Sequence, residues 1–362
     1  EGLRLFDLEL LEPDPNAVLE RVLAEIEQGL GGRAPEELRA AALTPEPEQV
    51  ALQTLILELL PCFFRTDPKR WALLTLWLLR SIVQHGHTLL AAPAYANFAL
   101  FLASRGQYER ARTFSQLAAD LAKGLGARAA PTLFVTSVIS LWWSPLRSGI
   151  PMLRTIAAQG LESGELMWAW LSEVMVARTL LLSGSELHRT MAVLENLVTR
   201  FGKSGPLEQL RLYRQMVRCL QGGTSERGRF EDADPADAAA RAQSGDRYLL
   251  GEYATIRLEL AYIFRDLAGA LQWLEAAAQH EEVFLAISFR SPYVFYGALA
   301  LIAAAERASG RERVALMARI HEFEGNLRRW ADQCPENFRH RHQLVLAELG
   351  RVYLHRADLA QA

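Results

Sequence analysis

Apolar residues recur at intervals of three and four along almost the whole chain, in blocks of about 15 to 20 residues. Gly, Pro or small polar clusters separate these blocks. Because this spacing places apolar side chains on one helix face, each block predicts an amphipathic α-helix followed by a short turn. The first helices are expected near residues 15–30, 48–65 and 68–85. Residues 1–47 are interpreted as an N-terminal helical connector.

From about residue 90 the blocks come in pairs with a recurrence of roughly forty residues. The pairs are expected to begin near Leu90, Arg128, Glu165, Pro206, Arg247, Pro292 and Asn337. A hairpin of this size cannot bury its apolar face alone, so neighbouring hairpins must stack on one another. The pattern therefore predicts an all-α fold in which about eight helical hairpins stack.

The first pair resembles a tetratricopeptide repeat (TPR). The matching positions are Tyr95, Ala99, Leu102, Gly106, Tyr108, Ala111 and Ala118, with small residues where the paired helices touch and glycine at the bend. Ser115 stands where the pattern has an aromatic residue, so the match is partial. The resemblance implies a right-handed α-solenoid of TPR-like hairpins over residues 48–362.

Two further copies of this pattern are weaker. One runs through Ala254, Ala261, Ala270, Leu274 and Ala277 without a turn glycine. The other comprises Leu346, Leu349, Gly350, Tyr353, Asp358, Leu359 and Ala362, with Ala357 at the turn position. We interpret this last copy as a truncated repeat whose second helix should begin just after Ala357.

One polar stretch near residues 222–247 interrupts the rhythm and is rich in Gly, Asp, Arg and Ser. It is read as an exposed connector between repeats, since insertions of this composition usually run over the surface. A mobile lid or a regulatory site is the alternative interpretation.

Composition and charge exclude several function classes. The chain has 362 residues and a formal net charge of -3, from 39 basic and 42 acidic residues, so it lacks the positive field that nucleic acid requires. No apolar run approaches the roughly 20 residues of a membrane span. The three cysteines match no zinc or disulfide framework, and no signal peptide opens the chain. We expect a cytoplasmic fragment of a longer protein.

No catalytic motif is recognised, and no cofactor or metal is expected. Gly202, Lys203 and Ser204 resemble the end of a phosphate-binding loop, but Leu197 stands where its first glycine belongs. The histidine pairs His85/His87 and His340/His342 are spaced by two, which points their rings apart on a helix, so a metal site is the weaker interpretation. The eight Trp residues are assigned to the core rather than to an aromatic cage.

Partner-binding candidates come from the helix of each hairpin that would line the concave side. These residues are Asn97, Leu100, Glu259, Tyr262, Glu348 and Arg351. Polar and aromatic side chains in such positions suit contacts with a peptide or a partner domain. The competing interpretation is that they are solvated or paired with one another.

A family resemblance appears in three segments. Residues 330–352, WADQCPENFRHRHQLVLAELGRV, resemble a signature of the helical-repeat region of large bacterial multi-domain signalling proteins. Residues 291–305, SPYVFYGALALIAAA, and residues 143–146, WSPL, are similar to further segments of that region, although Gly297 replaces a usual Ser. Those proteins join a serine/threonine kinase domain and a STAND-type AAA ATPase to TPR-like repeats, often followed by a sensor histidine kinase.

The resemblance implies a non-catalytic scaffold in a signal-transduction ATPase or kinase, which regulates output by binding a protein, a peptide or a neighbouring domain. The kinase, ATPase and phosphorelay motifs are not found in this chain. The alternative hypothesis is a domain that senses a small-molecule effector. An enzyme, suggested by the histidine pairs alone, is the third hypothesis.

Overall fold

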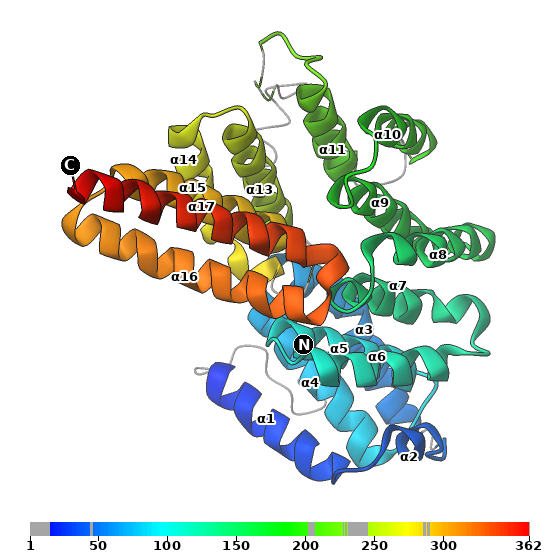
Figure 1. The fold of residues 1–362 in the computed structure, drawn as a ribbon. Coiled ribbons are helices and arrows are strands. Elements are labelled where there is room, and N and C mark those ends of the chain that lie inside the picture. The colour runs from blue at the N-terminus through cyan, green and yellow to red at the C-terminus, as the bar shows by residue number, and fades with distance from the viewer. Residues whose placement is uncertain are drawn as a thin grey trace. The chain divides into compact units, whose positions relative to one another are not determined.

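The computed structural model is all-helical (Figure 1). It describes residues 15–43, 46–201, 207–226, 228, 230, 245–284, 287 and 290–361. Within these residues the only extended pairing is a single bridge between Leu43 and His87. The predicted fold class, all-α, is therefore confirmed.

The described helices run from Pro15 to Gln361. In chain order they are α1 (Pro15–Leu30), α2 (Pro35–Arg39), α3 (Pro47–Thr66), α4 (Pro68–His85), α5 (Ala91–Ser104), α6 (Tyr108–Ala122), α7 (Ala130–Ile139), α8 (Ile150–Ser163), α9 (Leu166–Leu182), α10 (Leu187–Phe201), α11 (Leu207–Leu220), α13 (Arg247–Ile263), α14 (Leu267–Ala278), α15 (Arg290–Arg307), α16 (Gly310–Gln333) and α17 (Pro335–Gln361). Short 3₁₀ helices occupy Gly126–Ala129, Ser140–Trp142, Leu146–Gly149 and Glu281–Phe284.

These boundaries confirm the predicted helix pairs. The seven expected starting points correspond to the first residues of α5, α7, α9, α11, α13, α15 and α17, each within two residues or so. The three helices expected before residue 90 are α1, α3 and α4. Hydrophobic periodicity therefore located the elements well.

The chain divides into two compact units, which we describe separately. The first contains residues 1–140, 152–172 and 246–248. In this unit α4 packs against α1, α3 and α5, while α6 packs against α2 and α5. Gly29 permits a close approach of α1 to α4, because a Cβ atom there would overlap the Val83 side chain. Residues 15–30, expected as part of a connector, thus contribute to a core in which Val22 and Ile26 are fully buried.

The second unit contains residues 141–151, 173–245 and 249–362. Here α15 packs against α14, α16 and α17, and α10 packs against α11 (Figure 1). Gly297 lies where α15 is most tightly enclosed, since a Cβ atom at this position would overlap Phe323 and Leu274. A residue without a side chain is therefore needed there to let the helices approach.

The same turn recurs after four helices. In each, a residue with positive φ follows the helix, and the next N–H donates to the carbonyl five residues earlier, as in a Schellman motif. The residues with positive φ are Gly106 (74°), Gly184 (65°), Gly222 (73°) and Arg265 (66°). Successive turns are roughly forty residues apart, and twice that interval separates Gly106 from Gly184. The missing position in this series falls at residues 143–146, where the chain has no glycine.

The turn expected at Ala357 is not formed. Helix α17 runs without interruption from Pro335 to Gln361. The prediction of a turn at Ala357 is wrong, because alanine favours continuation of a helix and Ala357 does not take the positive φ that the other turns of this series contain.

Among the described helices, none combines the length and the apolar composition that a bilayer crossing requires.

Candidate functional site

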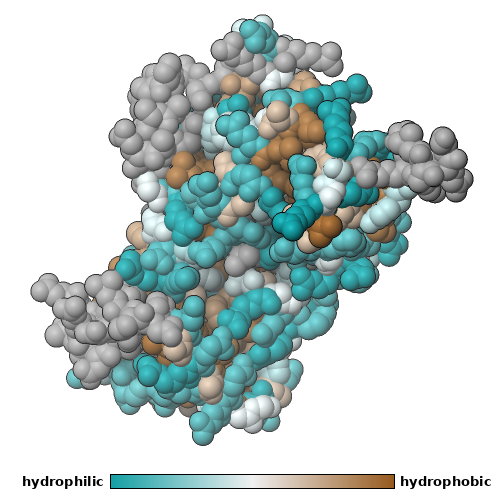
Figure 2. Space-filling view, turned by 90° about the vertical axis from the view of Figure 1, so that its left-hand side faces the viewer, coloured by the Kyte–Doolittle hydropathy of each residue, from teal (hydrophilic) through white to brown (hydrophobic). Residues whose placement is uncertain are grey.

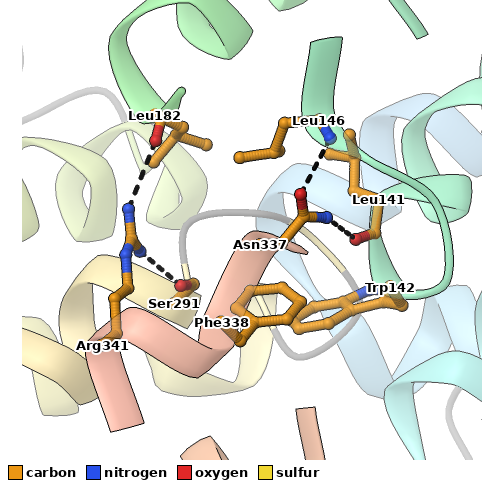
Figure 3. Close-up of a pocket in the computed structure, with 8 residues that line it drawn as sticks. All are labelled: Leu141, Trp142, Leu146, Leu182, Ser291, Asn337, Phe338 and Arg341. Atoms are coloured by element: carbon orange, nitrogen blue, oxygen red, sulfur yellow. Dashed lines mark hydrogen bonds between the residues drawn. The ribbon is translucent and has the colours of Figure 1, made fainter. Parts of the chain in front are cut away.

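Asn337, near the start of α17, holds the irregular turn at residues 141–146. Pro335 opens this helix, where the missing N–H of proline costs nothing. The buried Asn337 amide then makes three contacts in the second unit. Its Oδ1 accepts from the Leu146 N–H (2.9 Å), and its Nδ2 donates to the Leu141 carbonyl (2.8 Å) (Figure 3). The same Nδ2 also donates to the Ser144 carbonyl (2.8 Å). One side chain therefore satisfies three backbone groups of a turn that lacks regular helical bonding.

Three large aromatic rings pack beside this clamp. The ring centroids of Trp142 and Trp330 are 5.1 Å apart, and Phe338 lies 5.7 Å from Trp142 and 5.8 Å from Trp330. All three side chains are buried. The rings hold the 3₁₀ segment that precedes the turn against the end of α16 and the start of α17.

Arg341 lies one helical turn beyond Asn337 and faces the same side of α17. Its Nη1 donates to Ser291 Oγ (2.5 Å) and its Nη2 donates to the Leu182 carbonyl (3.4 Å). Figure 3 shows Arg341 and Asn337 reaching across one small pocket toward the ends of other helices. The guanidinium thus connects α17 to the first turn of α15 and to the end of α9.

Residues of the segments 143–146, 291–305 and 330–352 meet at this pocket. Leu146 ends the WSPL segment, Ser291 begins the SPYVFYG segment, and Asn337 belongs to the CPENF segment. Their hydrogen bonds join residues separated by as many as 193 positions in the sequence. The segments therefore have a structural role in holding the turn at residues 141–146. Arg341 lies at the edge of this turn.

A second pocket adjoins the first and shares Leu182 and Arg341 with it. It opens to solvent, and a water-sized sphere can occupy about 50 Å³ inside it, which is room for a few small groups. It is lined by Arg178, Leu181, Leu182, Tyr213, Met216, Thr255, Ile256, Glu259, Pro292 and Arg341, from helices α9, α11, α13, α15 and α17.

Arg178, which lines the second pocket, belongs to a buried ion pair. Arg178 Nη1 lies 2.7 Å from Glu252 Oε1, and both side chains are at most 5% exposed. Gln209 donates to the other carboxylate oxygen (2.8 Å), and the Tyr213 hydroxyl donates to Glu252 as well. A buried charge needs such partners to offset the loss of hydration. The network fixes the position of Arg178 on the pocket wall.

This network was missed in the sequence, although a signal was present. Arg178 interrupts the apolar stretch VMVARTLLL, and Glu252 interrupts the apolar first turns of α13. Opposite charges inside two apolar stretches predict a buried pair, since neither charge is stable in a core alone.

Glu259 also lines the same pocket. It is partly buried, and burial raises the pKa of its carboxyl group, while the nearby positive charge of Arg341 opposes that shift. The Tyr296 hydroxyl donates a hydrogen bond to it. Burial and the adjacent Glu259 also raise the pKa of Tyr296.

The structure brings part of the predicted partner-binding set together. Tyr262, Glu348 and Arg351 lie close enough for their charges to interact, and Tyr262 packs against the Tyr296 ring at 5.9 Å. Arg351 also pairs with Glu348 (2.9 Å) and with both oxygens of Glu306 (3.0 and 3.2 Å). These partners raise the pKa of Arg351 further.

The two candidates on α5 are placed differently. Leu100 is only 6% exposed and belongs to the core of the first unit. Asn97 is half-buried and donates to the Pro93 carbonyl of its own helix (2.9 Å). Leu100 is therefore unsuited to contact a partner directly.

The other chemical candidates resolve into structural contacts. His87 lies 3.0 Å from the Tyr95 hydroxyl, while His342 pairs with Glu324 at 2.7 Å. Within the described ranges no group of three or more His, Cys, Asp or Glu residues could hold a metal ion. Gly202, Lys203 and Ser204 lie outside the described residues.

One aromatic cage does exist, and a side chain of the protein fills it. Arg257 lies over the rings of Trp273 (4.4 Å), Phe230 (5.3 Å) and Tyr253 (5.6 Å). Phe230 comes from the predicted connector near 222–247, most of which, residues 231–244, lies outside the described part of the chain. The cation–π contacts hold Phe230 to α13.

Comparisons with known proteins add no relative: a scan against protein-family models gives no match, and searches among curated proteins and solved structures give none either.

Proposed function

We propose that this chain is a non-catalytic scaffold, a right-handed α-solenoid of TPR-like hairpins, that works in the cytoplasm as part of a larger signal-transduction ATPase or kinase. It regulates output by binding a protein or peptide partner, or a neighbouring domain. The observation that carries this proposal is the recurrence of one turn geometry at intervals of about forty residues, together with the packing of α5 on α6 and of α15 on α16 as neighbouring pairs. Repeats of this kind mostly serve as extended binding surfaces.

The proposed contact surface is the group formed by Tyr262, Glu348 and Arg351. Tyr and Arg are enriched among residues that dominate interface energies, and here a network of carboxylates fixes the Arg351 side chain. Hydrophobic residues also remain exposed on α17, namely Leu344, Leu346 and Tyr353. The face seen in Figure 2 carries separate hydrophobic areas among hydrophilic ones.

Cross-linking capture tests this proposal. A photo-reactive amino acid replaces Leu346, and the resulting protein captures its partners by cross-linking. Three forms are compared: one with Tyr262 and Arg351 intact, one with Tyr262→Ala and one with Arg351→Ala. The matched control is Arg189→Ala, an exposed arginine on α10. We expect both surface variants to lower the yield of the same cross-linked species at least about fivefold, as loss of a hot-spot residue does. Equal yields for all variants would contradict the proposed surface.

A second candidate function is the sensing of a small-molecule effector. The observation that favours it is the second pocket, whose walls combine apolar side chains with two arginines. Binding there would bias the arrangement of α9, α13 and α17 around it, which is how an effector shifts a population of states.

A further inference from the structure

The walls of the second pocket combine apolar and polar side chains. Leu181, Met216, Ile256 and Pro292 are apolar, and Arg178, Tyr213, Glu259 and Arg341 are most of the polar ones. All of these residues belong to the second unit. The pocket therefore suits a ligand with an apolar body and one polar end.

Arg341 presents positive charge to this space. Its two hydrogen bonds go to neutral oxygens, those of Ser291 and Leu182. No carboxylate of the described residues lies within ion-pair distance of its guanidinium, which has five N–H donors in all. The guanidinium keeps donors for a further acceptor, and its charge is not neutralised by direct contact.

The groups next to Arg341 add to the positive charge that it presents to the pocket. Arg178 is held rigidly by Glu252, so its position on the wall is fixed before any ligand arrives. Glu259 is the nearest acidic group to Arg341, and it is bound by Tyr296. Burial favours the neutral form of Glu259 and so weakens its pull on Arg341.

We propose that this pocket binds a small monocarboxylic acid, with the carboxylate on Arg341 and the apolar body against Leu181, Met216 and Ile256. A guanidinium fork matches a planar carboxylate in shape and charge. A monocarboxylate fits better than a phosphate monoester, since Arg178 is already paired with Glu252 and Arg341 alone would face the second charge of a phosphate. The inference deepens the effector-sensing function and rests on it.

Titration of the whole chain with defined probes tests the site. The probes are hexanoate and phenylacetate, with hexanamide as the uncharged match and hexyl phosphate as the dianionic match, and calorimetry measures binding. The variants are Arg341→Met and Leu181→Trp, the second of which adds bulk at an apolar wall residue and leaves Arg341 in place. The control is Arg189→Met, an exposed arginine on α10 away from the pocket lining.

We expect saturable binding of at least one carboxylate, a loss of affinity of about tenfold or more in both pocket variants, and no change in the control. Hexanamide should bind at least about tenfold more weakly than hexanoate. Circular dichroism checks that each variant is folded. If Arg341→Met does not fold, the affinity measured for Leu181→Trp decides whether the proposal stands. The proposal is overturned if neither carboxylate binds, if the amide binds equally well, if only the phosphate binds, or if Leu181→Trp binds as tightly as the unaltered protein.

The same probes separate the site from the function. If a carboxylate binds but leaves cross-linking yields at Leu346 unchanged, the site stands and the sensing function fails. If no carboxylate binds while the surface variants still lower the yields, the site fails and the scaffold function stands.

Discussion

Buried charges are the residues whose loss should be most damaging. Glu252 is fully buried and is the direct partner of Arg178. We predict that Glu252→Gln lowers the free energy of unfolding by about 3 kcal/mol or more, because it leaves the Arg178 charge buried without its counter-ion. Urea unfolding of the unaltered and variant proteins measures the difference.

The control for this prediction is Glu186→Gln, which removes an exposed carboxylate paired with Arg189 and should barely change stability. Combining Glu252→Gln with Arg178→Met should recover part of the loss, since the uncompensated charge is then gone. A double variant as unstable as the sum of its parts would show that the pair is not coupled.

His87 should make the protein sensitive to mild acid. Burial, with a smaller contribution from Arg33, lowers the pKa of His87 below its ordinary value of 6.5. As pH falls below about 6.5, the unfolded chain therefore takes up a proton that the folded protein resists, and stability falls until the pH reaches the folded-state pKa. Above pH 6.5 the effect is absent.

We predict that the unfolding temperature of the unaltered protein drops more between pH 7 and pH 5 than that of His87→Gln, which can keep a hydrogen bond to Tyr95. Partial desolvation lowers the pKa of the exposed His340 as well, so the variant should lose only part of the pH dependence. Identical slopes for the two proteins would contradict the assignment to His87.

At the scale of elements, the repeated turn sets where each hairpin bends. A Cβ atom at Gly184 would meet nothing within 4 Å, so any cost of a side chain there comes from the positive φ alone. We predict that Gly184→Ala destabilises the protein by about 1 kcal/mol. Arg265 already bears this strain in the equivalent turn, so Arg265→Gly should leave stability unchanged or raise it slightly.

Thermal or urea unfolding of these two variants measures the effect, with Gly350→Ala as the control. Gly350 lies inside α17 without a positive φ, so alanine there should stabilise the helix instead. If Gly184→Ala and Gly350→Ala shift stability in the same direction, the turn does not depend on glycine in the way proposed.

The sequence predicted the elements because helix periodicity and turn residues are local properties. The helices beginning near Leu90, Arg247 and Pro292 were all located from their apolar spacing. The bend at Ala357 was wrongly predicted because the repeat spacing was followed where the turn glycine is missing. Local patterns are reliable where spacing and turn chemistry agree.

The pocket could be predicted only in part. Glu259 was selected from its helix position, but Arg341 and Arg178 were not, because their importance comes from contacts with distant segments. Asn337 illustrates the reason, since its partners lie more than 190 positions earlier and nothing in its neighbourhood specifies them. Tertiary contacts of single polar residues have no periodic signal.

At the scale of the whole molecule, residues 141–151 have a special place in the chain. The segments before and after them, 1–140 and 152–172, belong to the first unit, whereas these residues belong to the second. Asn337 and the rings of Trp142, Trp330 and Phe338 are what bind them there. The segment lacks a glycine turn of its own, so its structure depends on α17.

Hydrogen exchange followed by mass spectrometry tests this dependence. We predict that Asn337→Ala speeds amide exchange across 141–151 by about tenfold or more, because three backbone groups lose their buried partner, an effect of about 1 to 3 kcal/mol on local opening. In Asn337→Ala, the amides of α5 should exchange at an unchanged rate. Asn97→Ala in α5 is the matched control, because it removes only a hydrogen bond within one helix. Unchanged exchange at 141–151 would show that the aromatic rings alone hold the segment. Faster exchange throughout both units would show that Asn337 supports the fold in general rather than this turn.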